Sequence, residues 1–340
     1  MARRKKQQPD VPLFGRDEAP AHAGGSGGGV RKHRRGERVS VHEEGAPSPG
    51  AGVRRHGRGG TIQPPAEHRP ATEQVAFDFA GGSGGGMNEE VPTGEGRILL
   101  GPHAVGEALR AGRRPVQVVF LSSAERGERF RDIGRLAKSR GVPARQADPE
   151  LIETLAAGRI HQGIVALAGE YPYLGLAELE RAVTERGPDS LVVALDQVQD
   201  PQNLGAIARS AVAFGVDLMV LPERRAAGVT DAVVRASAGA TELMRIARVP
   251  NLAEVLRRLG ALGLEVVGLD PEGEADMSVA DLKPPLCLVF GAEGPGLRRL
   301  TRELCHRRVR IPIAAGGVGS LNISVTAGIV LHAVRHPHRG

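Results

Sequence analysis

The stretch that decides the fold is IPIAAGGVGSLNISVTAGIVLHAV, which runs from Ile311 to Val334. Its first residues read as the end of a strand. The loop that follows, AAGGVG, has no side chain larger than valine, so its backbone amides can approach a ligand closely. The apolar run after Leu321 then predicts a helix. The alternative interpretation is an ordinary strand–loop–helix joint that binds nothing.

Polar residues lie where this helix is expected to begin. Ser320 is the predicted N-cap, and Asn322 and Ser324 would then lie in the first turn. The first turn of a helix has free N–H groups and a positive field, which favour negative or polar groups. The stretch therefore predicts a ligand-facing helix start.

Composition narrows the class of protein. The 340 residues are enough for two or three domains, and 41% of them are hydrophobic. Seven Phe, two Tyr and no Trp leave few platforms for stacking single-stranded bases. Cys287 and Cys305 lack the spacing of a disulfide framework or a metal site, which favours a reducing compartment. The sequence has neither a signal peptide nor a membrane-length apolar run, so we expect a cytoplasmic protein without a membrane partner.

The positive charge belongs to an N-terminal arm, residues 1–95, rich in Gly, Pro and Arg. Residues 1–58 contain 13 Lys/Arg and 6 Asp/Glu. Their net charge of 13 − 6 = +7 exceeds the net charge of +6 of the whole chain. The arm has almost no apolar periodicity, and we expect it to be disordered. Its arginine clusters are suited to holding phosphates, and the alternative is a solvated tail without a role. Met87 is a second candidate translation start.

Residues 96–170 alternate strand and helix patterns and predict a small α/β domain. The expected elements are a strand ending before Gly101, a helix over His103–Arg110, a strand over Val116–Ser122, a helix over Arg129–Arg140, an extended segment over Pro143–Ala147, a helix over Pro149–Ala156 and a strand over Gly163–Glu170. His103 and His161 read as structural or solvated. His161-Gln162-Gly163 is the better candidate for a substrate-facing loop. Residues 171–190 read as a linker with one helix.

Residues 191–340 predict a larger α/β domain with a parallel sheet. Expected strands are LVVALD, DLMVLP, LEVVGLD, LCLVFG and Arg308–Ile311, and expected helices are Leu204–Phe214, Thr230–Ala238 capped by Thr230, and Asn251–Leu262 capped by Asn251. Polar loops follow three of the strands, at Asp200–Arg209, Gly291–Leu297 and Ala314–Asn322. Because α/β sheets bind ligands at the carboxyl ends of their strands, we expect these loops to meet at one edge.

Single residues in these loops are candidates for chemistry. Asn203 is either a helix N-cap or a ligand contact. Glu293 needs a partner if it is buried, and Arg209 is one candidate. The loop GAEGPG comes too late in the chain for a dinucleotide fingerprint. No Ser-His-Asp spacing, metal cluster or P-loop is present.

Three motifs in order resemble the SpoU (TrmH) family of RNA ribose 2′-O-methyltransferases: NLGAIARSA at Asn203–Ala211, LVFGAEGPGL at Leu288–Leu297 and IPIAAGGVGSLNISVTAGIVL at Ile311–Leu331. The resemblance covers about 191–335. Residues 96–170 also resemble the small RNA-binding domain of the members that methylate a guanosine of 23S ribosomal RNA. Between Ile311 and Ser320 the chain has one residue more than its relatives, which affects the expected contacts at Ala314–Gly319.

The resemblance implies an α/β SPOUT fold with a trefoil knot, S-adenosylmethionine as methyl donor, no metal and a homodimer whose sites are completed by the partner copy. It implies cofactor contacts at Gly291, Ile311 and Leu321. The implied polar catalytic set is Asn203, Arg209, Glu293, Ser320 and Asn322. Because a guanidinium almost never loses its proton, Arg209 is better suited to hold a phosphate or a developing alkoxide than to act as a base.

Three rival functions stay open at this point. One is a non-catalytic RNA-binding or ribosome-assembly factor with the same fold. The second is a transfer RNA methyltransferase of the same family, and the third is a nucleotide-dependent oxidoreductase, which the late glycine loop disfavours.

Overall fold

The computed structural model describes residues 74–76, 90–92, 97–314 and 319–337, all within one compact unit that spans 68–340. The prediction of a disordered arm therefore falls almost entirely outside the described residues, as does most of the loop with the extra residue. The two short segments that are described form an antiparallel pair, β1 (Gln74–Ala76) with β2 (Glu90–Pro92). We expected no strand there, so this pair departs from the prediction.

The smaller of the two main sheets has the strand order β3-β6-β4-β5. Its strands are β3 (Ile98–Leu100), β4 (Val116–Ser122), β5 (Ala144–Ala147) and β6 (Ile164–Ala168). β6 is antiparallel to both neighbours, and β4 and β5 are parallel. Helices α1 (Gly101–Ala111) and α2 (Glu128–Ser139) share one core with this sheet, and α3 (Pro149–Ala156) packs in another. The elements match the sequence prediction to within a few residues.

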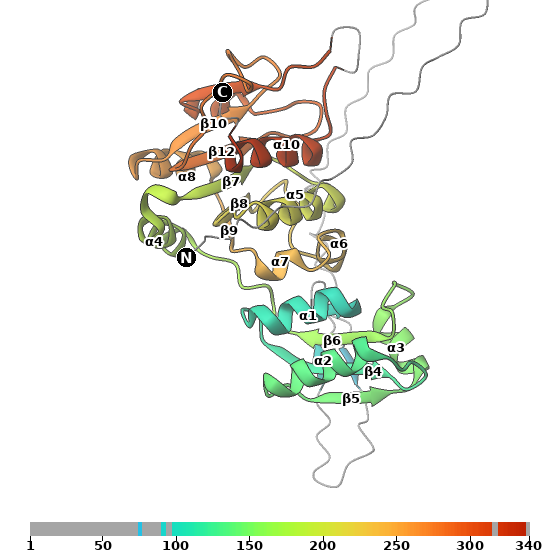
Figure 1. Cartoon of the computed structure of the whole chain (residues 1–340). Coiled ribbons are helices and arrows are strands. Elements are labelled where there is room, and N and C mark those ends of the chain that lie inside the picture. Colours follow the sequence, from blue (N-terminus) through green and yellow to red (C-terminus); the bar gives the residue numbers. More distant parts are fainter. Residues whose placement is uncertain (1–73, 77–89, 93–96, 315–318, 338–340) are drawn as a thin grey trace, which may run out of the picture. The chain divides into compact units, whose positions relative to one another are not determined.

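The larger sheet has the order β11-β13-β10-β12-β7-β8-β9, and all its described pairings are parallel. Its strands are β7 (Leu191–Leu195), β8 (Leu218–Pro222), β9 (Ile246–Val249), β10 (Glu265–Leu269), β11 (Ala275–Asp276), β12 (Leu286–Phe290) and β13 (Arg307–Arg310). The sequence did not identify β9 and β11, which lie at the two edges (Figure 1). β8 and β9 extend the sheet on one side of β7, and β10 to β13 lie on the other side. The strand order therefore reverses between β7 and β12.

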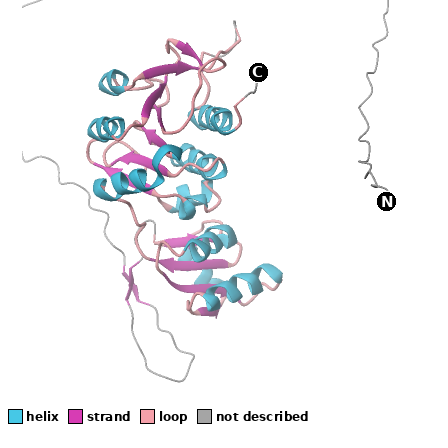
Figure 2. Ribbon diagram, turned by 60° about the vertical axis from the view of Figure 1, so that its left-hand side comes forward, coloured by secondary structure: helices cyan, strands magenta, loops and turns pink. Residues whose placement is uncertain are grey.

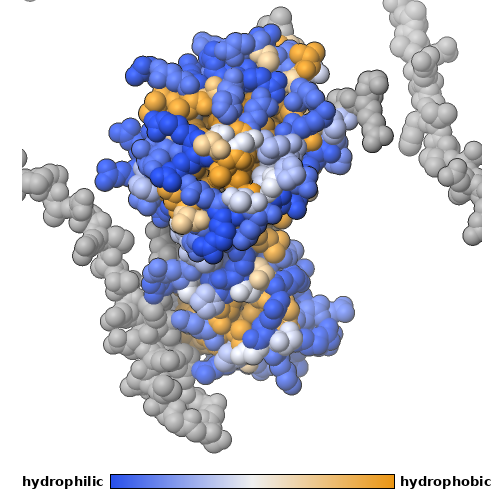
Figure 3. Space-filling view, turned by 90° about the vertical axis from the view of Figure 1, so that its left-hand side faces the viewer, coloured by the Kyte–Doolittle hydropathy of each residue, from blue (hydrophilic) through white to orange (hydrophobic). Residues whose placement is uncertain are grey.

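Helices cover both faces of this sheet, which explains its continuous apolar strands (Figures 1 and 2). One face packs against α5 (Pro201–Ala213) and α10 (Ile323–Arg335), and the other against α4 (Leu176–Arg186) and α8 (Leu252–Ala261). Along β7, Val193 and Leu195 lie in the first core, and Val192 and Ala194 lie in the second. The remaining helical elements are η1 (Gly187–Asp189), α6 (Asp231–Ala236), α7 (Ala240–Leu243) and α9 (Arg299–Leu304). With α4 and α8 turned toward the viewer, the surface is mainly hydrophilic (Figure 3).

Candidate active site

One asparagine joins the three polar loops. The Asn322 side-chain Nδ2 donates hydrogen bonds to Oδ1 of Asn203 at 3.0 Å and to Oε1 of Glu293 at 2.7 Å. Asn203 begins α5, Glu293 follows β12, and Asn322 precedes α10. The loops after β7 and β12 flank the point where the strand order reverses, which is where open α/β sheets place their ligands. The expected meeting of the three loops is confirmed.

Thr230 and Asn251 are the N-caps of α6 and α8, as predicted, whereas the caps of α5 and α10 differ from those expected. Asn322, and not Ser320, is the N-cap of α10, since its Oδ1 accepts from the Ser324 N–H at 2.8 Å. The N-cap of α5 is Asp200, which accepts from the Gln202 N–H at 3.0 Å, so Asn203 lies inside the first turn. Both helices start two or more residues from the predicted cap because a second good cap residue lies within three positions of it, Asp200 before Asn203 and Asn322 after Ser320. This shift leaves the Asn203 side chain free for the contact with Asn322.

Arg209 lies apart from this network. It is exposed on α5, and the described part of the chain contains no hydrogen-bond or ion-pair partner for it. Six residues separate it from Asn203, which on a helix means about 9 Å along the axis and about 120° around it. The suggested pairing of Arg209 with Glu293 is therefore wrong, and Asn322 takes that place.

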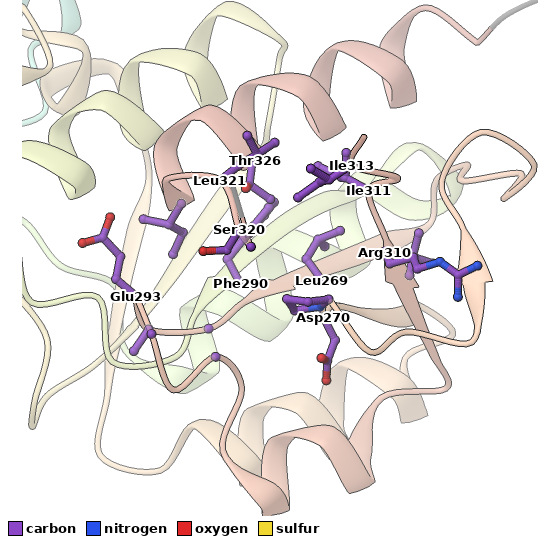
Figure 4. A pocket seen from close by; sticks show the side chains of 18 of the residues that line it. Leu269, Asp270, Phe290, Glu293, Arg310, Ile311, Ile313, Ser320, Leu321 and Thr326 are labelled. Atoms are coloured by element: carbon purple, nitrogen blue, oxygen red, sulfur yellow. The ribbon is translucent and has the colours of Figure 1, made fainter. Parts of the chain in front are cut away.

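A cavity of about 460 Å³ opens beside the network, within the usual range for small-molecule sites. Its walls include every predicted cofactor contact, Gly291, Ile311 and Leu321, together with the predicted catalytic residues Glu293 and Ser320. Figure 4 shows Glu293 and Arg310 at opposite sides, with Leu269 and Phe290 between them. The cavity thus has an apolar middle and polar ends.

Sequence reasoning missed the wall formed by the loop after β10, which supplies Asp270, Pro271 and Asp276. Hydrogen bonds from the Ser278 backbone N–H and hydroxyl lower the pKa of Asp276, so this wall carries a negative charge at neutral pH. The signal was available, because LEVVGLD places Asp270 at the carboxyl end of a strand of the same sheet.

Sequence reasoning also missed Asp196, which is fully buried at the end of β7. Its carboxylate accepts from the Arg298 N–H at 3.1 Å, from Arg298 Nε at 2.7 Å and from the Thr301 hydroxyl at 2.7 Å. These bonds fasten the far end of the loop that carries Glu293. At the near end, a Cβ on Gly291 would overlap the backbone of Gly296, so only glycine permits this tight fold of the loop. The cavity wall after β12 is therefore held rigidly at both ends.

The residues of the cavity suit S-adenosylmethionine. The apolar side chains offer a place for an adenine ring, and the glycine-rich turns present backbone groups for its edges. The ionised Asp276 provides a counter-charge for a cationic ligand. Among the described residues, no group of three or more His, Cys, Asp or Glu is arranged to hold a metal ion.

The candidate histidine of the smaller domain is engaged in local structure. His161 Nε2 lies 2.8 Å from Glu153 Oε2, and its Nδ1 accepts from the Gly163 N–H at 2.9 Å. A hollow beside it is lined by the carboxylates of Glu125, Glu150 and Glu153, which disfavour phosphate. His103 is exposed on α1.

Comparison with known proteins gives the family. Residues 190–332 match the SpoU rRNA Methylase family, and residues 98–174 match the domain described as RNA 2′-O ribose methyltransferase substrate binding. The chain is 41% identical over 241 residues to the 23S rRNA (guanosine-2′-O-)-methyltransferase RlmB of Ralstonia nicotianae, covering 70% of this chain and 95% of that protein. It is 38% identical over 279 residues to an uncharacterized tRNA/rRNA methyltransferase of Mycolicibacterium gilvum, covering 81% and 87%.

Solved structures support the same assignment. The SpoU methyltransferase AviRb of Streptomyces viridochromogenes, in complex with S-adenosylmethionine, matches with a TM-score of 0.58 at 29% identity, over 69% of this chain and 87% of that one. An rRNA methyltransferase of Sinorhizobium meliloti with the same bound cofactor matches with a TM-score of 0.57 at 26% identity, over 69% and 85%. The expected α/β SPOUT fold class and the expected cofactor are thereby confirmed. None of the described helices is long and apolar enough to cross a membrane. The chain belongs to the SpoU (TrmH) family and is an S-adenosylmethionine-dependent RNA methyltransferase.

Proposed function

We propose that the protein methylates the ribose 2′-hydroxyl of a guanosine in 23S ribosomal RNA. The observation that carries the proposal is the Asn203–Asn322–Glu293 network, which lies at the rim of the cofactor cavity, where a ribose and a methyl donor can meet. Relatedness to a 23S rRNA (guanosine-2′-O-)-methyltransferase, and a match to a substrate-binding domain over 98–174, support the ribosomal substrate. We place this activity in the cytoplasm.

The network residues position the ribose and the cofactor. When bound, S-adenosylmethionine supplies an electrophilic methyl group on a sulfonium. The attacking hydroxyl is a poor nucleophile, so alignment contributes much of the acceleration, up to roughly 7–11 kcal/mol in favourable cases. Glu293 and Asn203 orient the ribose, since Asn322 fixes both of their side chains. Gly291, Ile311 and Leu321 contact the cofactor, and Ser320 holds its polar end.

Arg209 acts on the RNA from outside this network. Its guanidinium keeps its proton, so it holds the adjacent phosphate or stabilises the alkoxide that forms on the ribose. Because Arg209 lies apart from Asn203 on the same helix, we propose that it serves the site of a second copy in a homodimer. Arg209 of one copy then lies opposite the cavity of its partner.

An exposed apolar face supports the dimer. Val325 is 50% exposed and Ile329 is 38% exposed, one turn apart on α10. Between them in sequence, Gly328 lies against Ser210, the residue after Arg209, because a Cβ on Gly328 would stand 3.8 Å from the Ser210 hydroxyl. Arg209 is therefore next in sequence to the contact between α5 and α10, and Val325 and Ile329 flank that contact on α10. A second copy that covers this face brings its own Arg209 along with it.

We also propose the division of labour along the chain. Residues 96–170 bind RNA, 171–190 connect, and 191–340 catalyse. The arm, 1–95, adds phosphate contacts without sequence preference. The segment 171–190 is itself packed on the catalytic part, since the hydroxyl of Tyr171 donates to the carbonyl of Thr241 at 2.9 Å.

The test is methyl transfer from labelled S-adenosylmethionine to unmodified 23S ribosomal RNA, with transfer RNA in parallel, followed by mapping of the modified nucleotide. The expected result is label on one guanosine ribose of ribosomal RNA. Label only on transfer RNA would overturn the substrate and keep the chemistry. No label on either, with cofactor binding intact, would favour a non-catalytic RNA-binding factor.

The dimer is tested by sedimentation and by complementation. Val325→Glu with Ile329→Glu places charges on the apolar face and is expected to yield monomers without turnover. Mixing an Arg209→Ala variant with an Asn322→Asp variant should restore activity, because one of the two mixed sites contains both native residues. Absence of any recovery in mixed dimers would place Arg209 in its own copy's site.

A further inference from the structure

The loop between β8 and α6, Glu223–Val229, has no role in the site described so far. It follows the carboxyl end of β8, the strand next to β7, so it lies at the same sheet edge as the catalytic loops. The loop carries two consecutive arginines, Arg224 and Arg225, both exposed. In the described part of the chain, neither has a hydrogen-bond or ion-pair partner. Glu223 is the one acidic residue of the loop, so the two arginines leave it with a net positive charge.

Several other arginines of the larger domain are neutralised by carboxylates. Arg298 pairs with Asp196, Arg307 with Glu265, and Arg308 with Glu274. Arg302 pairs with Asp270 at 3.0 Å. An arginine without a carboxylate partner at a site edge is available for another anion, and its planar fork suits phosphate.

Hydrogen bonds on both sides of the two arginines fix the backbone of the loop, so the positions from which Arg224 and Arg225 extend are defined. The Ala227 N–H donates to the carbonyl of Val198 in the loop after β7, at 2.9 Å. The Val229 N–H donates to the Tyr173 hydroxyl at 2.6 Å, and the Arg248 guanidinium, which stacks over the Tyr173 ring, donates to the Glu223 carbonyl at 3.3 Å. Arg225 itself has a φ of 57°, a left-handed conformation that a non-glycine residue seldom adopts.

The position of the loop connects the catalytic edge with the smaller domain. Through Val198 it borders the segment that leads to Asn203. Directly after it comes α6, whose first residue, Asp231, forms an ion pair with Arg159 of the smaller domain. Arg159 stands two residues before His161, in the loop that the sequence singled out as substrate-facing. The loop with Arg224 and Arg225 therefore lies between the segment that leads to Asn203 and the helix that contacts the smaller domain.

We propose that Arg224 and Arg225 bind backbone phosphates of the substrate RNA beside the target nucleotide. The two arginines set the path of the strand and carry no base preference. This inference rests on the proposed RNA methylation, and it adds the surface that guides the RNA into the site.

The test compares RNA binding at several salt concentrations with the full chain and a fluorescent uridine homopolymer as the probe. The double variant Arg224→Ala/Arg225→Ala should flatten the slope of log affinity against log salt by about 1.4, which is the loss of two single-strand phosphate contacts. The matched control is Arg181→Ala/Arg257→Ala, which removes two exposed arginines from α4 and α8. These helices lie on the face of the sheet opposite α5 and α10, away from the catalytic loops. The control should keep the slope of the wild type.

Further variants separate charge from folding. Arg224→Lys/Arg225→Lys retains two cations and should keep most of the slope. S-adenosylmethionine affinity should be unchanged in all variants, which shows that the fold is intact. In turnover with ribosomal RNA, the alanine pair should raise KM for RNA about tenfold and leave kcat nearly unchanged.

Two outcomes would overturn the proposal. One is an unchanged salt slope in the alanine pair, and the other is an equal loss in the control pair. Because binding is measured without turnover, these outcomes are independent of which nucleotide is methylated. Failure of the proposed reaction would instead appear as missing label with a normal salt slope.

Discussion

The two sides of the candidate site are built on opposite principles. On the cofactor side, the loop after β12 is fastened by three hydrogen bonds to the buried carboxylate of Asp196 and by a glycine contact that admits no side chain. On the RNA side, Arg209, Arg224 and Arg225 are exposed, and the described residues offer them no partner. A pocket for a small ligand gains from rigid walls, whereas a surface for a polyanion needs unpaired cations. Asn322 stands where the two sides meet.

This contrast predicts that the two sides fail separately. Arg209→Ala should lower kcat by about 100- to 1,000-fold, the usual cost of losing one group that stabilises developing charge. S-adenosylmethionine affinity, measured by calorimetry, should stay at the wild-type value. Arg209→Lys retains the charge and should recover part of the rate. Near-normal turnover by the alanine variant would remove Arg209 from the reaction.

At the meeting point, Asn322→Asp separates the two roles of one side chain. Aspartate caps a helix as well as asparagine does, but it cannot donate to Asn203 and Glu293. Turnover should fall by about 10- to 100-fold, and the thermal stability should fall slightly, because the new carboxylate faces Glu293 and repels it. Asn322→Ala removes the cap as well and should cost about 1 kcal/mol of folding free energy in addition. Equal turnover in both variants and the wild type would mean that the network does not position the substrate.

On the cofactor side, Asp196→Asn should weaken S-adenosylmethionine binding about tenfold, which corresponds to about 1.4 kcal/mol. The carboxylate accepts at both oxygens, from Arg298 Nε at Oδ1 and from the Arg298 N–H and the Thr301 hydroxyl at Oδ2. The amide accepts at one position only and places an NH2 group against a donor at the other, so the loop that carries Glu293 loosens. The salt slope of RNA binding should be the same as in the wild type. A changed slope together with unchanged cofactor affinity would reverse the assignment of the two sides.

The smallest expected effect concerns a thiol beside this anchor. The pKa of Cys305 is raised to about 11, mainly by burial; Arg308 lowers it, and nearby carboxylates, Asp196 among them, contribute to the rise. Removing the negative charge in Asp196→Asn lowers this pKa, so a larger share of thiolate is present at any pH below it. Alkylation of Cys305 at pH 8, followed by mass spectrometry, should therefore be about two- to threefold faster in the variant. The buried Cys287 should stay unlabelled in both proteins.

The sequence predicted the elements of the cofactor side better than their contacts. The apolar runs of β7, β8, β10 and β12 are unmistakable because both of their faces are buried. The hydrogen bond from Arg298 to Asp196 joins residues 102 positions apart, and no local sequence pattern predicts such a contact. Ser320 and Asn322 are both good caps, so a prediction based on residue preference placed the start of α10 two residues early.

The proposed RNA side was harder to predict because, among the described residues, its arginines have no hydrogen-bond or ion-pair partner. Arg209 was one candidate partner for Glu293, because a buried unpaired carboxylate is costly, but helix geometry turns it about 120° from Asn203. Arg224 and Arg225 look like any surface arginines in the sequence. The structure adds that β8 lies next to β7 and that the loop carrying the two arginines is hydrogen-bonded to Val198, which places both arginines near the catalytic loops.

The most direct test of the account replaces a single oxygen atom. Once the methylated guanosine has been mapped, a ribosomal RNA substrate with a 2′-deoxyribose at that one position is assayed with labelled S-adenosylmethionine. The account predicts that label is lost entirely while the affinity for the RNA and its salt slope are retained. Continued labelling of that nucleotide would show that the methyl group goes to the base, and would contradict the proposal that the Asn203–Asn322–Glu293 network presents a ribose hydroxyl.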